Sequence, residues 1–512
     1  MKRIHPYKLV VHLILAAVLT GSCGKLELLK NVDSEAISAG EDLKNQTIWE
    51  FISSTSSIAN DTLKSLSLFT RAVERAGLKE FFGQDGQYTI IAPRNTAMEA
   101  FIASLGYSDL EDVPPAVLRN IFLGNTVNGK IFSYELPEGE LMTFETMNKD
   151  SISFIREPAS TNPYRVTINS APTFVSTAVR IRSQNLLCKN GVVHVIDTYT
   201  HYIPRTSAPD AASPGEGSMS ETLDVLKDAY MSNGSTTAKN TNYGSAVSLN
   251  VKKAAVDFTR RAITQFEVRQ PHSFQRIGTA RVGLYCTRVD GDGGIVSLFE
   301  DEPIDWLENQ VSWANCPIPG TVPIGDVNLS PGTGASGSVN KWHYIDITNA
   351  YQDAVRQNKT FINVGINTAD NDLFTFASKE YSTSSIPVGT RAPIIILTSP
   401  VASILSNPVN AGITVDRQSG NKILTTSELK FEGAESKNIF FVVKDLPQMG
   451  YLVVGGRPVL QEGVRFSQEQ IEKGAVRYLH SGEGNIDSFS LEGQDFQGGF
   501  YDDVLTVNVT IQ

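Results

Sequence analysis

The sequence predicts a multidomain, mainly β protein, and three observations support this prediction. A chain of 512 residues is too long for one hydrophobic core and suggests about three domains. Its 40 glycines and 23 prolines suit a turn-rich architecture, in a composition that is 41% hydrophobic and 19% charged. Residues 205–217, rich in proline, serine and glycine, have linker composition and separate a segment with helical periodicity from segments of short alternating strands.

The N-terminal segment is typical of an exported lipoprotein. Residues 1–22 combine basic residues, an apolar run and small residues directly before Cys23. The apolar run is too short to span a bilayer as a helix. The segment resembles a bacterial signal peptide with a lipobox, although Thr20 stands where leucine is usual, and this resemblance implies acylation of Cys23. Acyl chains hold a protein on a membrane, so we expect a lipid anchor at the outer membrane, on the cell surface or the periplasmic face, followed by a tether over residues 23–40. Ordinary secretion is the alternative.

The net charge disfavours one class of partner, and the cysteine content allows at most one disulfide. The formal net charge is −11, and about −14 without the three basic residues of the signal peptide, which disfavours nucleic acid as a partner. If Cys23 is acylated, three cysteines remain and at most one disulfide can form. Cys286 and Cys316 could pair if their Cα atoms come within bonding distance. No cysteine or histidine cluster has the spacing of a zinc site, so no metal is expected there.

Residues 41–204 are predicted to fold as one domain that mixes helices and strands. Leu66, Phe69, Val73 and Ala76 recur at helical spacing and predict one buried stripe. A strand is expected over residues 87–92. A helix should follow over residues 95–105, with Asn95 or Thr96 as its N-cap.

Two motifs in this segment, at residues 89–101 and 190–197, resemble those of a fasciclin domain. The resemblance implies an α+β fold and a role in adhesion. The Tyr-His pair that the family often uses in adhesion would fall on Gly124-Asn125, so that contact is not expected here. His194 alternates with apolar neighbours and is predicted to be structural. Asp197, three residues later, should point to the other face of the strand and form no catalytic dyad with it.

Residues 218–400 show short strands alternating with turns, as in a β-sandwich. One strand is expected over residues 262–268. Residues 279–289 and 294–299 are predicted to form a hairpin around Asp290-Gly291-Asp292-Gly293, where Asp-Gly suits positive φ angles. Calcium is the less favoured explanation of this acidic turn, because the turn lacks the closing glutamate of a calcium-binding loop.

The middle segment also carries a series of short motifs in a fixed order: residues 228–230, 242–244, 260–266, 280–285, 306–313, 342–348, 376–380 and 392–397. The series resembles the DNRLRE family of jelly-roll modules. The resemblance implies a jelly-roll β-sandwich that binds polysaccharide, such as acidic alginate, and leaves structural calcium open.

Candidate ligand-binding residues follow from the chemistry of sugar recognition. Aromatic rings pack on the apolar face of a sugar ring, and a guanidinium holds a carboxylate with two hydrogen bonds. Since two consecutive strand residues point to opposite faces, at most one of a neighbouring pair should reach a ligand. Trp306, Trp313 and Trp342 lie in alternating patterns and are predicted to be core residues. The candidates are Tyr230, Tyr243, Arg260, Arg261, Lys379 and Arg391.

Residues 405–512 predict a second sandwich, with strands over residues 424–431, 438–443, 450–454 and 504–511. Motifs over residues 446–452, 463–474, 476–480 and 487–498 resemble the repeat of chondroitin sulfate proteoglycans, which implies a cadherin-like β-sandwich. Apolar residues spread over these motifs are expected to fill its core: Phe466, Ile471, Val476, Tyr478 and Phe489.

Together, these features favour a binding protein over an enzyme. No nucleophile elbow, phosphate-binding glycine loop or zinc-protease motif occurs in the sequence, and no cofactor is expected. The leading hypothesis is a membrane-anchored lipoprotein that binds an extracellular polysaccharide or glycoconjugate through the jelly roll. The alternative is an adhesin that binds a surface protein or matrix partner through the fasciclin-like and cadherin-like domains. A polysaccharide-degrading enzyme is a third, weaker hypothesis, because paired carboxylates are recognised only in three dimensions.

Overall fold

The computed structural model describes residues 44–512 except 57–65, 159–164, 170–178, 211–217, 255–257 and 321–322. Cys23, the predicted signal peptide and the predicted tether therefore lie outside the described residues. The chain divides into two compact units, one within residues 1–200 and one that includes His201–Gln512. No helix in the described ranges combines the length and the apolar character that crossing a membrane requires.

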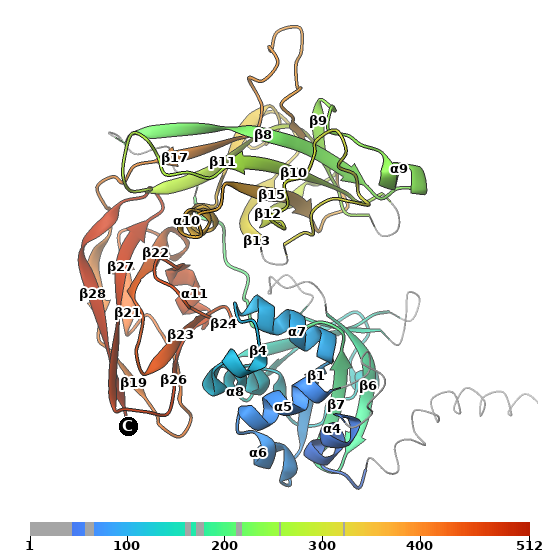
Figure 1. Ribbon diagram of the computed structural model, residues 1–512, viewed down its shortest axis with the longest axis vertical. Coiled ribbons are helices and arrows are strands. Elements are labelled where there is room, and N and C mark those ends of the chain that lie inside the picture. Colours follow the sequence, from blue (N-terminus) through green and yellow to red (C-terminus); the bar gives the residue numbers. More distant parts are fainter. Residues whose placement is uncertain are drawn as a thin grey trace, which may run out of the picture. The chain divides into compact units, whose positions relative to one another are not determined.

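The first unit is built on a seven-stranded sheet in the order β2-β1-β7-β6-β5-β4-β3. Helices of this unit lie beside β1 and β7 (Figure 1). The helices are α4 Ile48–Ser56, α5 Ser67–Arg75, α6 Lys79–Gly83, α7 Asn95–Ser104 and α8 Pro115–Gly124. The strands are β1 Tyr88–Pro93, β2 Thr126–Asn128, β3 Leu141–Glu145, β4 Ser151–Arg156, β5 Val166–Ile168, β6 Val179–Cys188 and β7 Gly191–Ile196.

The predicted apolar stripe at α5 is confirmed, but the predicted helix cap is wrong. All four stripe residues are buried: Leu66, Phe69, Val73 and Ala76. Helix α7 begins at Asn95, and its N-cap, Arg94, makes no capping side-chain hydrogen bond. The Asn95 side chain instead accepts a hydrogen bond from the backbone N–H of Leu68 (2.9 Å) at the start of α5. The sequence showed a residue able to cap a helix, but not which helix it caps.

The two fasciclin-like motifs meet in this sheet, where β1 and β7 pair in parallel with Ile91 opposite His194. His194 is buried, its Nε2 lies 3.0 Å from the carbonyl oxygen of Ile131, and burial lowers its pKa to about 4. Asp197 pairs instead with Arg94, with 2.9 Å between the charged atoms. His194 is thus structural, as predicted.

Asn190 links three elements of the first unit. Its Oδ1 accepts a hydrogen bond from the backbone N–H of Ile48 in α4 (2.8 Å). Its Nδ2 donates to the carbonyl oxygens of Phe82 (3.0 Å) and Gln84 (2.7 Å) at the end of α6. The residue is 1% exposed, so water cannot replace these bonds.

We expect Asn190→Ala to destabilise the first unit by about 2–4 kcal/mol, because it leaves buried backbone groups without partners. Calorimetric unfolding of the full-length protein measures this as a shift of one transition. Asn128→Ala removes an exposed asparagine of β2 and should leave that transition in place. Equal shifts for the two variants would contradict a structural role for Asn190.

The middle part of the chain forms a jelly roll in which strand β8 takes part in both sheets. Its first residues pair with β17, and its later residues pair with β10. One sheet has the order β8-β17-β11-β16-β9, with β14 also paired to β11, and the other has the order β8-β10-β15-β12-β13. The elements are β8 Ser220–Ser232, α9 Thr236–Asn240, β9 Ser248–Val251, β10 Arg260–Glu267, β11 Thr279–Val289, β12 Gly294–Glu300, β13 Pro323–Leu329, β14 Lys341–Asp346, α10 Thr348–Arg356, β15 Phe361–Thr368, β16 Phe374–Ala377 and β17 Ile394–Thr398.

The predicted hairpin over residues 279–299 is wrong, although both of its strands exist. Strand β11 pairs with β14, β16 and β17, whereas β12 pairs with β13 and β15. The turn at Asp290–Gly293 therefore carries the chain from one sheet to the other. Gly291 and Gly293 do adopt the positive φ angles expected there, of 57° and 79°. Turn chemistry predicts that the chain reverses, but it does not specify which strands pair.

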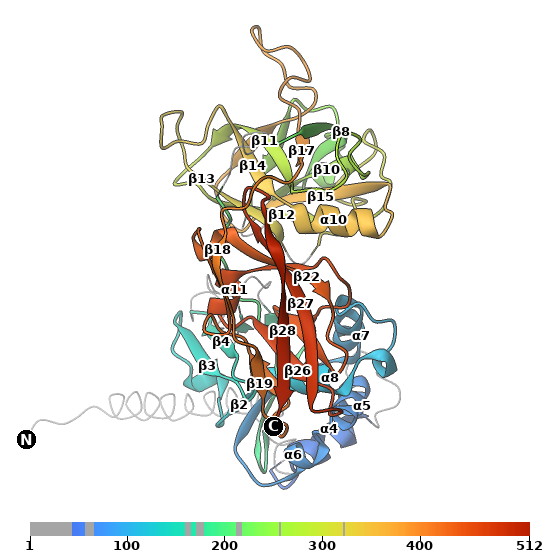
Figure 2. The same cartoon turned by 90° about the vertical axis from the view of Figure 1, so that its left-hand side faces the viewer.

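The last part of the chain is a sandwich of two main sheets, in the orders β19-β28-β27-β22-β25 and β20-β26-β23-β24 (Figure 2). The predicted core residues Phe466, Ile471, Val476, Tyr478 and Phe489 are all buried. The predicted strand over residues 424–431 is wrong, since two short strands flank a turn there. The elements are β18 Ser406–Asn410, β19 Ile413–Val415, β20 Asn421–Ile423, β21 Leu429–Glu432, η3 Ser436–Asn438, β22 Ile439–Asp445, β23 Gly450–Val454, β24 Arg457–Pro458, β25 Arg465–Ser467, α11 Gln468–Glu472, β26 Val476–His480, β27 Ile486–Asp495 and β28 Phe500–Ile511.

Buried polar contacts join the jelly roll to this last sandwich within the second unit. Arg465 Nη2 lies 2.8 Å from Asp346 Oδ1, and the two side chains are 5% and 12% exposed. The Arg465 guanidinium also stacks over Phe440, 4.0 Å from the ring centre. Gln494 Nε2 donates to the carbonyl oxygen of Gly278 (2.7 Å). These contacts explain why the two sandwiches form one compact unit.

Candidate functional site

The outer face of strands β11 and β14 carries a cluster of aromatic residues. The inward-facing residues Val282 and Leu284 of β11 are fully buried, so Tyr285 points outward by strand alternation. Antiparallel pairing places Trp342 of β14 opposite Tyr285. Two residues further along β14, Tyr344 lies on the same face. We call Tyr285, Trp342 and Tyr344 the aromatic platform.

The geometry of the aromatic platform leaves ring surface open to solvent. Trp342 and Tyr344 are almost coplanar, with ring centres 6.1 Å apart and an angle of 13° between the rings. Tyr285 meets Trp342 edge-on at 5.6 Å and is itself buried, at 8% exposed, so the open ring surface belongs to Trp342 and Tyr344. Tyr344 is 36% exposed and Trp342 is half-buried. Gly283 makes this arrangement possible, because a Cβ there would lie only 3.0 Å from the Tyr344 ring.

Arg391 adds a positive charge to the platform. Its guanidinium carbon lies 4.6 Å from the centre of the Tyr285 ring, a cation–π contact. Within the described ranges Arg391 forms no ion pair. Its Nε is buried and has no hydrogen-bond partner among the described residues. A guanidinium with unused donors beside open aromatic rings can bind a planar carboxylate with two hydrogen bonds.

A second group of candidates lies where β8 ends and β10 begins: Tyr230, Arg260 and Tyr243, the last from the loop after α9. The two tyrosine rings stack on each other, with centres 4.3 Å apart and an angle of 22° between them. Burial raises the pKa of Tyr230, and the neighbouring Tyr243 raises it further. Because each ring already covers one face of the other, this pair offers less open aromatic surface than the platform.

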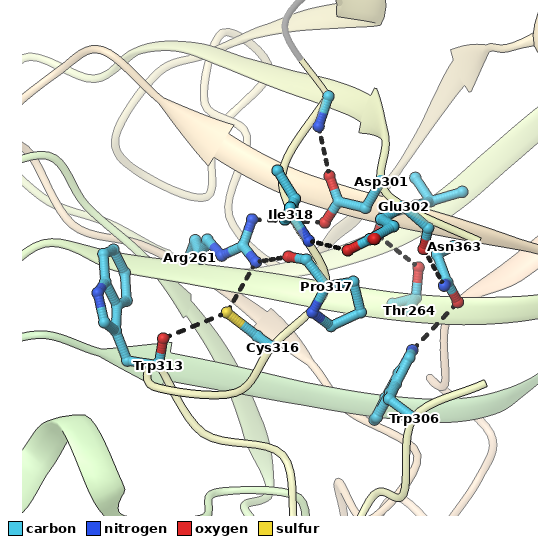
Figure 3. Close-up of polar contacts among 12 residues, drawn as sticks. Arg261, Thr264, Asp301, Glu302, Trp306, Trp313, Cys316, Pro317, Ile318 and Asn363 are labelled. Carbon is cyan, nitrogen blue, oxygen red and sulfur yellow. Dashed lines mark hydrogen bonds and ion pairs between the residues drawn. The ribbon is translucent and has the colours of Figure 1, made fainter. Parts of the chain in front are cut away.

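Arg261 cannot reach a ligand, which corrects its place among the candidates. Figure 3 shows its guanidinium beside Cys316 and Pro317, in the segment that follows β12. Its Nη1 lies 3.5 Å from Asp301 Oδ2, and the two side chains are 4% and 0% exposed. Its Nη2 donates to the carbonyl oxygen of Pro317 and to Cys316 Sγ (2.9 Å). Burial raises the pKa of Asp301 to about 6, while the Arg261 charge lowers it.

The same segment after β12, residues 301–320, also contains Trp306 and holds it in the interior, as predicted. Its indole Nε1 donates to Asn363 Oδ1 (3.1 Å), and its side chain packs with Ile263 and Met231. Asn363 in turn donates to the backbone oxygens of Glu302 and Ile304, both at 2.8 Å (Figure 3). For Trp342 the predicted core position is wrong, since this residue lies on the open face of the other sheet.

The disulfide considered between Cys286 and Cys316 is not formed, and both thiols are free. Cys286 lies in the core between the two sheets. Cys316 packs with Trp306 on the opposite side of strand β10. The two cysteines fall in one domain, but the sheet separates them.

Lys379, another candidate, already forms ion pairs within the structure. Its Nζ lies 2.6 Å from Glu308 Oε2 and 3.3 Å from Glu380 Oε1. Its backbone N–H donates to Asp228 Oδ2 (2.8 Å). Lys379 thus belongs to an internal charge cluster, and Arg391 is the candidate cation best placed beside aromatic rings. Tyr285 and Tyr344 were not among the candidates, although the spacing of Trp342 and Tyr344 two residues apart was a signal for a shared face.

Three family models match the chain in order. A fasciclin domain matches residues 64–199, carbohydrate-binding module family 96 matches residues 220–388, and a cadherin-like domain matches residues 408–509. The predicted series of three domains is confirmed. The mainly β fold class is confirmed with it, and all three matched domains are of non-catalytic kinds.

The chain is also similar to individual proteins over about a third of its length. It is 26% identical over 181 residues to the transforming growth factor-beta-induced protein ig-h3 of Sus scrofa, which covers 33% of this chain and 22% of that protein. A structural match to the FAS1 domain pair of the insect cell adhesion molecule fasciclin I has 14% identity and a TM-score of 0.23, and covers 30% of this chain and 51% of that one. The chain thus spans about a fifth of the first protein and half of the second.

We expect Arg261→Ala to destabilise the carbohydrate-binding module by about 3–5 kcal/mol, because it leaves the carboxylate of Asp301 buried without its cation. Three of the four tryptophans lie in this module, so denaturant unfolding followed by tryptophan fluorescence reports on it. Arg260→Ala is the matched control. Arg260 is half-buried and forms no ion pair within the described ranges, so the control should change stability by less than about 1 kcal/mol. A small effect of Arg261→Ala would contradict a structural role.

Proposed function

We propose that this protein binds an acidic extracellular polysaccharide at the aromatic platform, without transforming it. The matched domains support a carbohydrate-binding or adhesive role, and the family 96 module supports glycan binding. The observation that carries the finer proposal is Arg391, which forms no ion pair with the described residues and stacks on Tyr285 beside Trp342 and Tyr344. Ring faces would pack on the sugar, and the guanidinium would hold a uronate carboxylate.

We expect Trp342→Ala to weaken binding of an alginate oligosaccharide about tenfold to a hundredfold, since it removes a stacking surface worth about 1.4–2.8 kcal/mol. Arg391→Gln should weaken binding of acidic oligosaccharides and reduce its dependence on salt, while leaving any binding of neutral ones unchanged. Isothermal titration with the full-length protein measures both effects.

Arg288→Gln is the matched control for the arginine change. Arg288 lies on the same strand as Tyr285, is exposed and is already paired with Asp290. It should therefore bind oligosaccharide like the unchanged protein. Equal effects of the two arginine variants, or no binding to any acidic or neutral glycan, would contradict the proposal. In the second case, attachment to a surface protein through the fasciclin domain becomes the favoured function.

We also propose that the mature protein is anchored in the outer membrane through acyl chains on Cys23. The support is the lipobox-like sequence before this residue, together with the extracellular character of the ligand proposed above.

We expect metabolic labelling with a palmitate analogue in a Gram-negative host to label the protein, and Cys23→Ser to abolish the label and release the protein from membranes. Cys316→Ser should stay labelled and membrane-bound, because Cys316 hydrogen-bonds inside the module. An unlabelled parent protein recovered from the medium would contradict the anchor.

A further inference from the structure

Three carboxylates, none of them a residue of the aromatic platform, converge at strand β8. Asp228 lies on β8, Glu308 follows the buried Trp306, and Glu380 follows strand β16. One carboxylate oxygen from each lies within 4.8 Å of the others. Segments far apart in sequence thus bring three negative charges to one place.

The protein neutralises only part of this charge. Lys379 is the cation in contact, at 2.6 Å from Glu308 and 3.3 Å from Glu380. Glu308 Oε1 accepts a hydrogen bond from the backbone N–H of Asp228 (2.8 Å), which caps the free edge of β8. One ammonium against three carboxylates leaves a net charge of about −2 when all are ionised.

Two carboxylate oxygens of the cluster accept no hydrogen bond from the described residues. Asp228 is 1% exposed, yet its Oδ1 is buried without a hydrogen-bond partner among the described residues. Glu380 Oε2 is likewise buried and unpartnered there. An unsatisfied buried carboxylate oxygen is costly, so these atoms indicate a missing positive ligand.

The chemistry and spacing of the oxygens favour calcium. Carboxylate oxygens are ligands for hard cations, and Ca²⁺–O bonds of about 2.3–2.6 Å allow two ligands of one ion to lie up to roughly 5 Å apart. Mg²⁺, with bonds of about 2.0–2.1 Å, spans only about 4 Å and demands a stricter octahedron. We propose that Asp228, Glu308 and Glu380 form a calcium site that ties the edge of β8 to the segments after β12 and β16.

Lys379 gives this proposal a distinctive consequence. Its ammonium contacts two of the three carboxylates, so it competes with a bound cation for them. Replacing it with an uncharged side chain of similar length should therefore tighten calcium binding. A purely structural acidic cluster would instead lose the one counter-charge that the described residues supply, and would gain nothing from calcium.

The test is calcium titration of the full-length protein after EDTA treatment, by calorimetry and by thermal unfolding. We expect one calcium ion per chain at this site and a rise of several degrees in the midpoint of the module's transition. Asp228→Asn and Glu380→Gln should lose both effects. Lys379→Met should bind calcium about tenfold more tightly.

Asp292→Asn is the matched control, since Asp292 lies in the exposed acidic turn and should leave both effects intact. Asp228→Asn is also expected to be no less stable than the parent protein in EDTA, because it removes an uncompensated charge. If Asp228→Asn fails to fold, Glu380→Gln tests the site instead. Glu380 is only half-buried, so this change should disturb the fold less. Absence of calcium binding by the parent protein, or equal binding by Glu380→Gln, overturns the proposal. Neither result bears on glycan binding at the aromatic platform.

Discussion

Strand β8 belongs to both sheets of the jelly roll, and the placement of the module's polar groups depends on that constraint. The register between β8 and β10 shifts between Gln265 and Phe266, so that Leu226 has no partner and is exposed. After this bulge, Ala229 and Met231 pack with Trp306 of the segment that follows β12, and Asp228 lies beside Glu308 of the same segment and Lys379. One extra residue thus sets which side chains of β8 enter the apolar cluster and which meet the charged groups.

The two sheets of the module consequently have different outer faces. One is covered by residues 301–320, whose polar backbone is satisfied by Asn363 and by the Arg261–Asp301 pair. Buried ion pairs of this kind add little net stability, but removing one partner is costly. The face that carries Trp342 and Tyr344 has aromatic rings in contact with solvent. Tryptophan and arginine side chains therefore stabilise the fold on one sheet, whereas on the other sheet they lie on the open face.

The carbohydrate-binding module is also fixed to its neighbour. Arg465 of the cadherin-like domain pairs with Asp346, the last residue of the platform strand β14, and Arg276 pairs with Glu492 across the same boundary (2.6 Å). The segment before the module contacts this domain too, since Asp210 hydrogen-bonds Asn438 (2.8 Å). The cadherin-like domain thus braces the module on which glycan binding is proposed.

Periodicity and local motifs determined the domain series, the buried stripe at α5, the core of the last sandwich and the structural role of His194, because each depends on neighbours close in sequence or on a short signature. Pairing partners were decided only in three dimensions. The Asp290–Gly293 turn joins two sheets, Asn95 caps the preceding helix, and Cys286 and Cys316 lie on opposite sides of a strand. Whether an arginine is buried like Arg261 or open like Arg391 depends on which loop covers its sheet, and side-chain alternation along a strand carries no information about that loop.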